Sequence, residues 1–378
     1  MKKTAVCVLF GGASSEYEVS LRSAAAVLQN IDREAFAVYM LGITREGRWL
    51  YYDGPILLIE KDIWHTSAYA RPAILSPDRG EQGILLLPRT GREPYSRQIR
   101  HRLIAGADSM PDDDGLRVLP VDVVFPVLHG KNGEDGTVQG LLELAGLPYV
   151  GSGVLGSAGC MDKEVTHIIL QSAGIKKAKL LAVRPEQMQD LQVLEAKLSS
   201  ELGYPMFVKP ANAGSSVGIT KVKTAADLQA ALALAFCHDS KAVVEQSVTG
   251  QEIECAVMGN DAPIAAEVLG EVIPTHEFYD YAGKYLDDST AQCIPAGISR
   301  DLAEEVRAVA VRAYRLMGCA GLARVDFFVR GSGDVVLNEI NTIPGFTSIS
   351  MYAKLFVASG VPYSDIITRL IGYALEAR

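Results

Sequence analysis

The sequence has neither a long apolar run nor an excess of positive charge. No apolar stretch approaches the roughly 20 residues that a membrane-spanning helix needs. The 36 lysines and arginines are outnumbered by 45 aspartates and glutamates, which gives a formal net charge of −9 at pH 7. An acidic chain is repelled by phosphate backbones and by anionic lipids. We therefore expect neither a nucleic acid nor a membrane among the partners of this protein.

Paired cysteines and internal repeats are also missing. The six cysteines are scattered without a CxxC pair, and the chain has no heptads, low-complexity tracts or fixed-period repeats. Scattered thiols are typical of reduced proteins, so we predict a cytoplasmic location. The opening MKKTAVCVLFGG is apolar, but it is short, ends in Gly-Gly and leads directly into a helical pattern. These features favour a first β-strand over a signal peptide.

What the sequence does contain is enough apolar material for two or three domains. The chain has 378 residues, of which 48% are hydrophobic. A strand, a helix and a second strand alternate over residues 4–43, and another strand pattern covers 121–128, which predicts a parallel sheet. Residues 54–117 are rich in Pro, Gly, Arg and Asp, so we expect loops and an insertion there. The strand-rich part after residue 247 makes the predicted fold class mixed α/β.

Four polar residues interrupt two apolar, strand-like runs in RVDFFVRGSGDVVLNEIN near the C-terminus. The Gly-Ser-Gly-Asp turn predicts a β-hairpin. If the turn is centred on 332–333, Asp326 lies opposite Glu339, Arg324 lies opposite Asn341, and all four share a face. Two facing carboxylates repel each other unless a cation separates them, and Mg²⁺ prefers such oxygen ligands. An edge hairpin with a solvated polar face is the alternative.

Three loops also combine glycine with charged residues after predicted strands. KPANAGSSVG, which begins at Lys209, has backbone N–H groups that can cradle phosphate. It contains no GK[ST], so it is not a P-loop, and most Gly/Ser loops are ordinary turns. EYEVS and HGKNGEDG follow strands at the edge where open α/β sheets bind ligands, so Glu18 and His129 are candidates to grip an amino acid. Alternatively, Glu18 complements a helix N-terminus and His129 is an ordinary loop histidine.

Two further segments have both a functional and an ordinary interpretation. Lys163 stands at a predicted helix start, where it either shares an anion with the helix dipole or is a solvated surface lysine. FYDYAGKYLDD, residues 278–288, mixes tyrosines, a lysine and acids without periodicity. Such loops often act as lids over an active site, although a packed surface loop would have the same composition.

Taken in order, these motifs resemble those of a known family. The segments FGGASSEYEVS, HGKNGEDGTVQG, GSGVLGSAGCMDK, KPANAGSSVGITKV, FYDYAGKY, ARVDFF and NEINTIPGFTSIS occur colinearly from residue 10 to about 350. The chain thereby closely resembles the D-alanine–D-alanine ligases of the ATP-grasp superfamily. The resemblance implies three α/β domains, which we place at 1–151, 152–245 and 246–378, with ATP held between the last two. It also implies a cytoplasmic homodimer.

The resemblance implies an activity as well. ATP would phosphorylate the carboxylate of one D-alanine, and the amine of a second D-alanine would attack the acyl phosphate, in peptidoglycan precursor synthesis. The nucleotide-binding residues are then expected to be Lys163, Lys209, Ser216, Glu245 and Glu252. The ligands of two Mg²⁺ ions, which Mn²⁺ could replace, are expected to be Asp326, Glu339 and Asn341.

The remaining expected site residues concern the amino acids and the lid. The substrate-binding residues are expected to be Glu18, His129, Lys284, Ser350 and Met351. The catalytic residues are expected to be Glu18, Ser215, Tyr285, Arg324 and Gly345. In this scheme the serine and the tyrosine tie the lid to the site, whereas the arginine and the glycine N–H stabilise the oxyanion.

The second substrate and a loss of catalysis are the open alternatives. Related ligases use D-lactate or D-serine, and the lid pattern YDYAGKY disfavours D-lactate. Apolar Met351 suits the methyl group of alanine, but a pocket cannot strongly reject an isostere that merely adds a hydroxyl, so D-serine stays open. A catalytically silent nucleotide-binding protein would be expected to have lost a metal ligand or Arg324, and the sequence retains them all.

Overall fold

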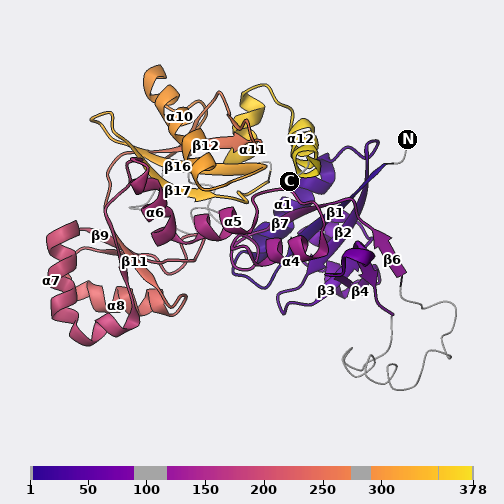
Figure 1. Cartoon of the computed structure of the whole chain (residues 1–378), viewed down its shortest axis with the longest axis horizontal. Coiled ribbons are helices and arrows are strands. Elements are labelled where there is room, and N and C mark those ends of the chain that lie inside the picture. The colour runs from indigo at the N-terminus through magenta and orange to yellow at the C-terminus, as the bar shows by residue number, and fades with distance from the viewer. Residues whose placement is uncertain (1–2, 89–116, 274–290, 348, 377–378) are drawn as a thin grey trace.

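The computed structural model describes residues 3–88, 117–273, 291–347 and 349–376. These residues form three β-sheets with helices packed on them, so the fold class is the predicted mixed α/β. The N-terminal and central sheets lie toward opposite ends of the molecule, and the C-terminal sheet lies between them (Figure 1). Within the described ranges, no helix combines the length and apolarity needed to cross a membrane.

The N-terminal sheet has the strand order β6-β5-β4-β3-β2-β1-β7. As predicted, β1 runs parallel to β2 and to β7, but the strands from β2 to β6 pair antiparallel. The described part of the predicted insertion, residues 54–88 and 117, therefore adds regular strands to the sheet, which its Pro- and Gly-rich sequence did not indicate; residues 89–116 lie outside the described residues. The strands are β1 (Thr4–Gly11), β2 (Phe36–Ile43), β3 (Trp49–Tyr52), β4 (Ala70–Leu75), β5 (Gly83–Leu86), β6 (Arg117–Pro120) and β7 (Val123–Leu128).

Helix α1 covers one face of this sheet and begins at the site described below. Its apolar side, including Leu21, Ala24 and Val27, packs in one core with the alternate residues Val6, Val8 and Phe10 of β1. The helices of this region are α1 (Tyr17–Asn30), α2 (Ile56–Glu60) and α4 (Thr137–Ala145), with 3₁₀ turns at Trp64–Thr66 and Arg79–Glu81.

The central sheet has the order β10-β9-β11-β8 and packs on two helices through a leucine-rich core. Its strands are β8 (Leu180–Val183), β9 (Met206–Pro210), β10 (Thr220–Val222) and β11 (Ala242–Gln246). The helices are α5 (Val154–Met161) and α6 (Lys163–Ser172), which precede the sheet, followed by the 3₁₀ turn Pro185–Asp190, α7 (Leu191–Leu202) and α8 (Ala225–Phe236).

The C-terminal sheet has the order β15-β14-β12-β16-β17, with β13 paired to β12. Helix α10 packs on one face of it through Val306, Ala310 and Tyr314. The strands are β12 (Gln251–Met258), β13 (Ile264–Ala265), β14 (Gly270–Ile273), β15 (Ala291–Cys293), β16 (Leu322–Val329) and β17 (Val335–Asn341). The helices are α10 (Arg300–Leu316), α11 (Met351–Ala358) and α12 (Tyr363–Leu375).

The hairpin of β16 and β17 has the predicted pairing at its polar end. Arg324 lies opposite Asn341, and Asp326 lies opposite Glu339. Cross-strand partners point to the same side of a sheet, so the four polar side chains share one face. The Nδ2 of Asn341 donates a hydrogen bond to Asp326 at 2.9 Å, which agrees with this placement.

The hairpin has this register because of a β-bulge that was not predicted. Near the turn, Phe327 pairs with Leu337 rather than with Asn338, so the turn is not centred on 332–333. Asn338 is the extra residue of a β-bulge, and it shifts the pairing back by one position. The predicted pairs are therefore correct because the bulge compensates for a turn that differs by one residue.

The C-terminal helix returns to the N-terminal sheet. Apolar residues of α12, including Ile366, Leu370 and Ile371, share a buried cluster with Val123 and Phe125 of β7. Figure 1 shows α12 beside α1, next to the C-terminus. The first and last parts of the chain therefore build one core.

Candidate active site

Two adjoining cavities lie between the three sheets. The first, here called the N-terminal cavity, has a volume of about 190 Å³ and reaches from the hairpin to the loops after β1 and β7. The second, the central cavity, has a volume of about 380 Å³ and reaches from the same hairpin to β9, β11 and residues 246–250. They share lining residues, including Lys177, Lys209, Glu245, Arg324 and Glu339. The two cavities therefore form one continuous cleft.

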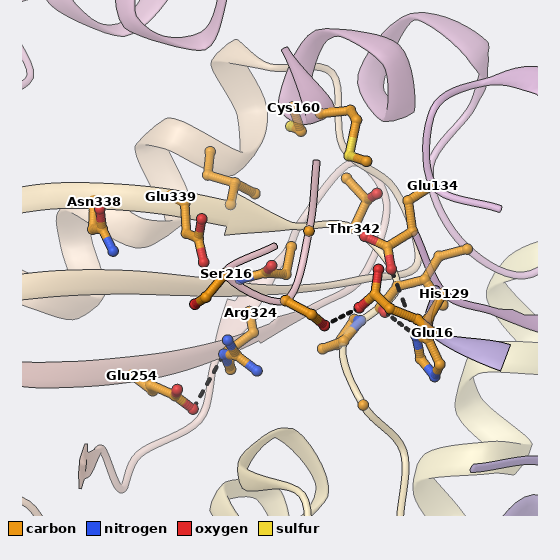
Figure 2. A pocket seen from close by; sticks show the side chains of 18 of the residues that line it. Glu16, His129, Glu134, Cys160, Ser216, Glu254, Arg324, Asn338, Glu339 and Thr342 are labelled. Carbon is orange, nitrogen blue, oxygen red and sulfur yellow. Dashed lines mark hydrogen bonds and ion pairs between the residues drawn. The ribbon is translucent and has the colours of Figure 1, made fainter. Parts of the chain in front are cut away.

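Arg324 holds the acidic face of the hairpin together. Its Nε and Nη2 donate to the two carboxylate oxygens of Asp326 at 2.7 Å each, and its Nε lies 3.1 Å from Glu254 on β12. Figure 2 shows the contact with Glu254. Burial alone would lower the pKa of Arg324, but the attraction of Asp326 and Glu254 outweighs burial and raises that pKa well above its usual value. The guanidinium is therefore charged and fixed in position.

Asp326, Glu339 and Asn341 bring two carboxylates and one amide to the same face. Oxygen donors of this kind suit Mg²⁺ or Mn²⁺. In the described part of the chain, no cluster of three or more His, Cys, Asp or Glu side chains is arranged to hold a metal ion. The donor set fits a hard cation that takes its other ligands from phosphate or water, as Mg²⁺ usually does.

Lys209 and Glu245 form a largely buried ion pair on the neighbouring strands β9 and β11, with side chains 15% and 12% exposed. Burial would lower the pKa of Lys209, but the attraction of Glu245 outweighs it and raises that pKa. Burial would raise the pKa of Glu245, and Lys209 reverses that effect, so the carboxyl pKa is lowered. Lys163, at the start of α6, donates from Nζ to the backbone oxygen of Ala213 at 2.7 Å. Both predicted lysines therefore line the N-terminal cavity.

Lys177 is a third lysine in the cleft, and no motif in the sequence indicated its position. It lines both cavities, and its Nζ donates to the backbone oxygen of Asn338, the bulge residue, at 2.5 Å. Burial, which outweighs the attraction of Glu245, lowers its pKa to about 8. Glu254 was also missed, although it lies two residues from the predicted Glu252 on a strand and must therefore share its face.

His129 is almost fully buried and held by three groups. Its Nδ1 lies 3.0 Å from the backbone oxygen of Ile343 and 3.6 Å from the carboxylate of Glu134. Its Nε2 lies 3.0 Å from the hydroxyl of Ser23 on α1. Burial would lower the pKa of His129, but Glu134 outweighs burial and raises it, which favours the charged imidazolium. Figure 2 shows His129, Glu134 and Glu16 side by side in the cavity.

The N-terminal carboxylate of the site is Glu16, and the prediction of Glu18 is not supported by the geometry. Glu16 is the N-cap of α1, 5% exposed, and it accepts a short hydrogen bond from the hydroxyl of Ser215. Glu18 lies outside both cavities; its side chain is 55% exposed and pairs with Arg45 at 2.9 Å. A helix turns by about 200° in two residues, so only one of the two glutamates can face the cleft.

The loop that carries Ser215 and Ser216 has an unusual backbone. Both serines have positive φ, 49° and 59°, which is the left-handed region that favours glycine. Such residues cost of order 1–3 kcal/mol each and cluster at functional sites. In this conformation both serines line the cleft. Ser215 donates to Glu16, and Ser216 lies where the two cavities join.

The segment after the hairpin forms a wall of the N-terminal cavity. Gly345, Ser350 and Met351 all line it. The hydroxyl of Ser350, the N-cap of α11, accepts from the backbone N–H of Thr347 at 3.0 Å. Met351 is 3% exposed and packs against Gly270, where a Cβ would come within 2.4 Å of its sulfur.

The other predicted residues are placed as follows. Glu252 lines the central cavity, at a distance from the N-terminal loops. Tyr285 and Lys284 lie outside the described residues. The described positions except Glu18 therefore line one cleft, with the lysines and Glu245 toward the central sheet and with His129 and Glu16 toward the N-terminal sheet.

The chain is similar to known proteins over its whole length. Two family models match it: D-ala D-ala ligase N-terminus over residues 5–152, and D-ala D-ala ligase C-terminus over residues 169–372. The D-alanine–D-alanine ligase of Ruminiclostridium cellulolyticum is 47% identical over 100% of this chain and 96% of the relative. D-alanine–D-alanine ligase A of Escherichia coli is 44% identical over 100% of this chain and 97% of the relative. Among solved structures, the VanG D-Ala:D-Ser ligase from Enterococcus faecalis is 38% identical with a TM-score of 0.84, covering 99% of this chain and 100% of that one.

Proposed function

Because the chain belongs to the D-alanine–D-alanine ligase family and has its ATP-grasp fold, we propose that it joins two D-alanine molecules with ATP as the phosphoryl donor. The reaction supplies D-alanyl-D-alanine for peptidoglycan precursors, which is the role of the family. The observation that carries the proposal is the continuous cleft, which has Lys177 and Lys209 where its two cavities join and a buried carboxylate and histidine in the N-terminal cavity. One end suits a nucleotide, and the other suits an amino acid.

The central cavity is the proposed nucleotide site. Phosphoryl transfer depends mainly on positioning and on neutralising negative charge. Lys209 lines this cavity as well as the N-terminal one, whereas Lys163 lines the N-terminal cavity. Both lysines are fixed by neighbours, Lys163 by the backbone of Ala213 and Lys209 by Glu245. Glu252 lies farther along the same cavity, where it is suited to the sugar or base of the nucleotide. This assignment places the γ-phosphate where the two cavities meet.

The acidic face of the hairpin is the proposed metal site. Asp326, Glu339 and Asn341 would hold two Mg²⁺ ions, or Mn²⁺ in their place, beside the phosphates. When bound, the ions would neutralise the charge that develops during phosphoryl transfer. Arg324, held in place by Asp326 and Glu254, would balance these carboxylates and direct its remaining N–H groups toward the reacting carbonyl.

The N-terminal cavity is the proposed amino-acid site. The carboxylate of Glu16 would bind the ammonium of the first D-alanine, and the imidazolium of His129 would lie near its carboxylate. Preorganised donors facing a developing oxyanion contribute about 3–4 kcal/mol each, and Arg324 with the N–H of Gly345 would serve in this way. Ser350 and Met351 would contact the second amino acid.

The proposal has four further parts. The lid roles of Tyr285 and Lys284 remain predictions, as do the homodimer, the cytoplasmic location and the domain limits at 151 and 245. The proposed function itself is tested by incubating the protein with D-alanine, ATP and Mg²⁺ and measuring phosphate release. No release between neutral and alkaline pH would contradict it.

D-serine as second substrate is the alternative, and one finding favours it. The VanG D-Ala:D-Ser ligase is 38% identical to this chain with a TM-score of 0.84. The relatives named D-alanine–D-alanine ligase are more similar in sequence, at 44–47% identity. A competition assay with equal D-alanine and D-serine as acceptors, with both dipeptide products quantified, separates the two. A mainly D-Ala–D-Ser product would overturn our choice.

A further inference from the structure

Lys177 is fixed at the junction of the two cavities by the backbone of β17. Its segment forms an isolated parallel bridge with Leu337, and the N–H of Leu337 donates to the backbone oxygen of Lys176 at 2.9 Å. The Lys177 ammonium then donates to the oxygen of Asn338 at 2.5 Å. This position is one residue before Glu339, which Figure 2 shows beside Asn338 on the strand. The ammonium therefore lies next to the proposed phosphate and metal region.

The hydrogen bond to the Asn338 carbonyl does not explain why a charged residue occupies position 177. A neutral donor would satisfy the carbonyl, whereas a buried ammonium loses hydration. The titratable groups that face it come from several elements: Glu245 on β11 and Glu339 on β17 attract it, Lys209 on β9 and Lys163 on α6 repel it, and burial together with its charge lowers the pKa of His167 on α6. Three lysines that converge on one cavity repel one another unless they share an anion.

The unused N–H donors of the Lys177 ammonium also indicate a ligand. Asn338 is its hydrogen-bond partner among the described residues, and an ammonium has three N–H donors, so two remain for a ligand. Lys177 and Lys209 both line the N-terminal and the central cavity, so a ligand that extends from one cavity into the other passes both.

We propose that Lys177 is a nucleotide-binding residue, which joins Lys163 and Lys209 in holding the phosphate end of the nucleotide. The inference deepens the proposed function and rests on it for the identity of the ligand. It assigns to this chain a third phosphate-binding lysine, contributed by the segment between α6 and β8 that pairs with the metal-binding strand.

The test compares Lys177→Met and Lys177→Gln with a matched control, Lys176→Met. Lys176 is the adjacent lysine, but its side chain is 66% exposed, pairs with Asp334 at 2.6 Å and lines neither cavity. Dissociation constants of ADP and adenosine are measured by titration calorimetry, because these ligands share the base and ribose but differ in phosphate. Loss of a charge-assisted hydrogen bond predicts ADP binding weakened about 10- to 100-fold in both Lys177 variants, with adenosine binding unchanged. The control should bind both ligands as the unmodified protein does.

The variants also separate charge from the backbone contact. Gln can still donate to the Asn338 oxygen, so a purely structural lysine predicts that Lys177→Gln restores binding. A pH series adds a second readout: ADP affinity of the unmodified protein should fall above pH about 8, where Lys177 loses its proton, and Lys177→Met should lack this fall. Both proteins contain the neighbouring charged residues Glu245, Glu339, Lys209 and Lys163. The difference between their two pH profiles of ADP affinity therefore reports the titration of Lys177.

Three results would overturn the inference. The first is an equal weakening of ADP and adenosine binding in the Lys177 variants. The second is normal ADP binding by Lys177→Gln, and the third is no ADP binding by the unmodified protein. Binding of ADP requires no turnover, so a protein that binds ADP through Lys177 but releases no phosphate with D-alanine would refute the proposed function alone.

Discussion

Replacing Glu16 by Gln, with Glu18→Gln as the matched control, tests which glutamate anchors the first amino acid. Glu16 is 5% exposed and faces the cleft, so its charge acts on a substrate ammonium with little screening by water. A hydrogen bond to a charged group contributes about 1.5–3 kcal/mol, so Glu16→Gln should lower kcat/KM for D-alanine about 10- to 150-fold. Glu18 forms an exposed ion pair with Arg45, and such pairs contribute at most about 1 kcal/mol to stability. Glu18→Gln should therefore leave kcat/KM within about twofold of the unmodified enzyme.

The assay for this pair is the initial rate of phosphate release against D-alanine concentration at saturating ATP and Mg²⁺. The dissociation constant of ADP serves as a control and should be the same in both variants, because neither glutamate lines the central cavity. The reasoning would be refuted if Glu18→Gln lost activity by tenfold or more (about 1.4 kcal/mol) while Glu16→Gln kept it.

Three further predictions concern Glu339 on the metal face, Lys177 in the cleft and the Lys241 ion pairs at the start of α6. Glu339→Ala should abolish phosphate release with little change in Tm, since a proposed metal ligand is removed from a partly exposed position; near-normal turnover would contradict the metal assignment. Lys177→Met should stabilise the fold by up to about 3 kcal/mol below pH 8, because the folded protein depresses the pKa from 10.5 to about 8. This gain should vanish as the pH rises to about 10.5, and Tm measured across that range would show a constant difference if the cause were packing alone. Lys241→Met should lower Tm, because Lys241 is 8% exposed and bonds to Asp162 at 2.5 Å and Glu164 at 2.8 Å; an unchanged Tm would show that these ion pairs contribute nothing.

The polar hairpin shows how far sequence alone could define the metal face. Alternation of apolar and polar residues gave the strands and the shared face of Asp326 and Glu339. The β-bulge at Asn338 could not be predicted, because it depends on how the turn and the neighbouring segment 176–178 fit against β17. The predicted pairing is therefore correct because two differences compensate: the turn is shifted by one residue, and the bulge at Asn338 shifts the pairing back.

The amino-acid end of the cleft was predicted less well, for a local reason. The motif EYEVS was found, but the choice between its two glutamates depends on where α1 begins. The helix begins at Tyr17, which leaves Glu16 as the N-cap facing the cleft and turns Glu18 to the solvent. Lys177 carried no signal at all, because its role depends on a pairing with residues more than 150 positions away.

The contact between α12 and the N-terminal sheet has a consequence during synthesis on the ribosome. β1, β2 and β7 are complete once residue 128 has emerged, but part of their core consists of Ile366, Leu370 and Ile371. At about 5–20 residues per second, roughly 12–50 s pass before that helix is made. During this interval the nascent sheet exposes apolar surface to its surroundings. A chaperone that binds the nascent chain would find its target on this face, and release would follow when the final helix takes its place.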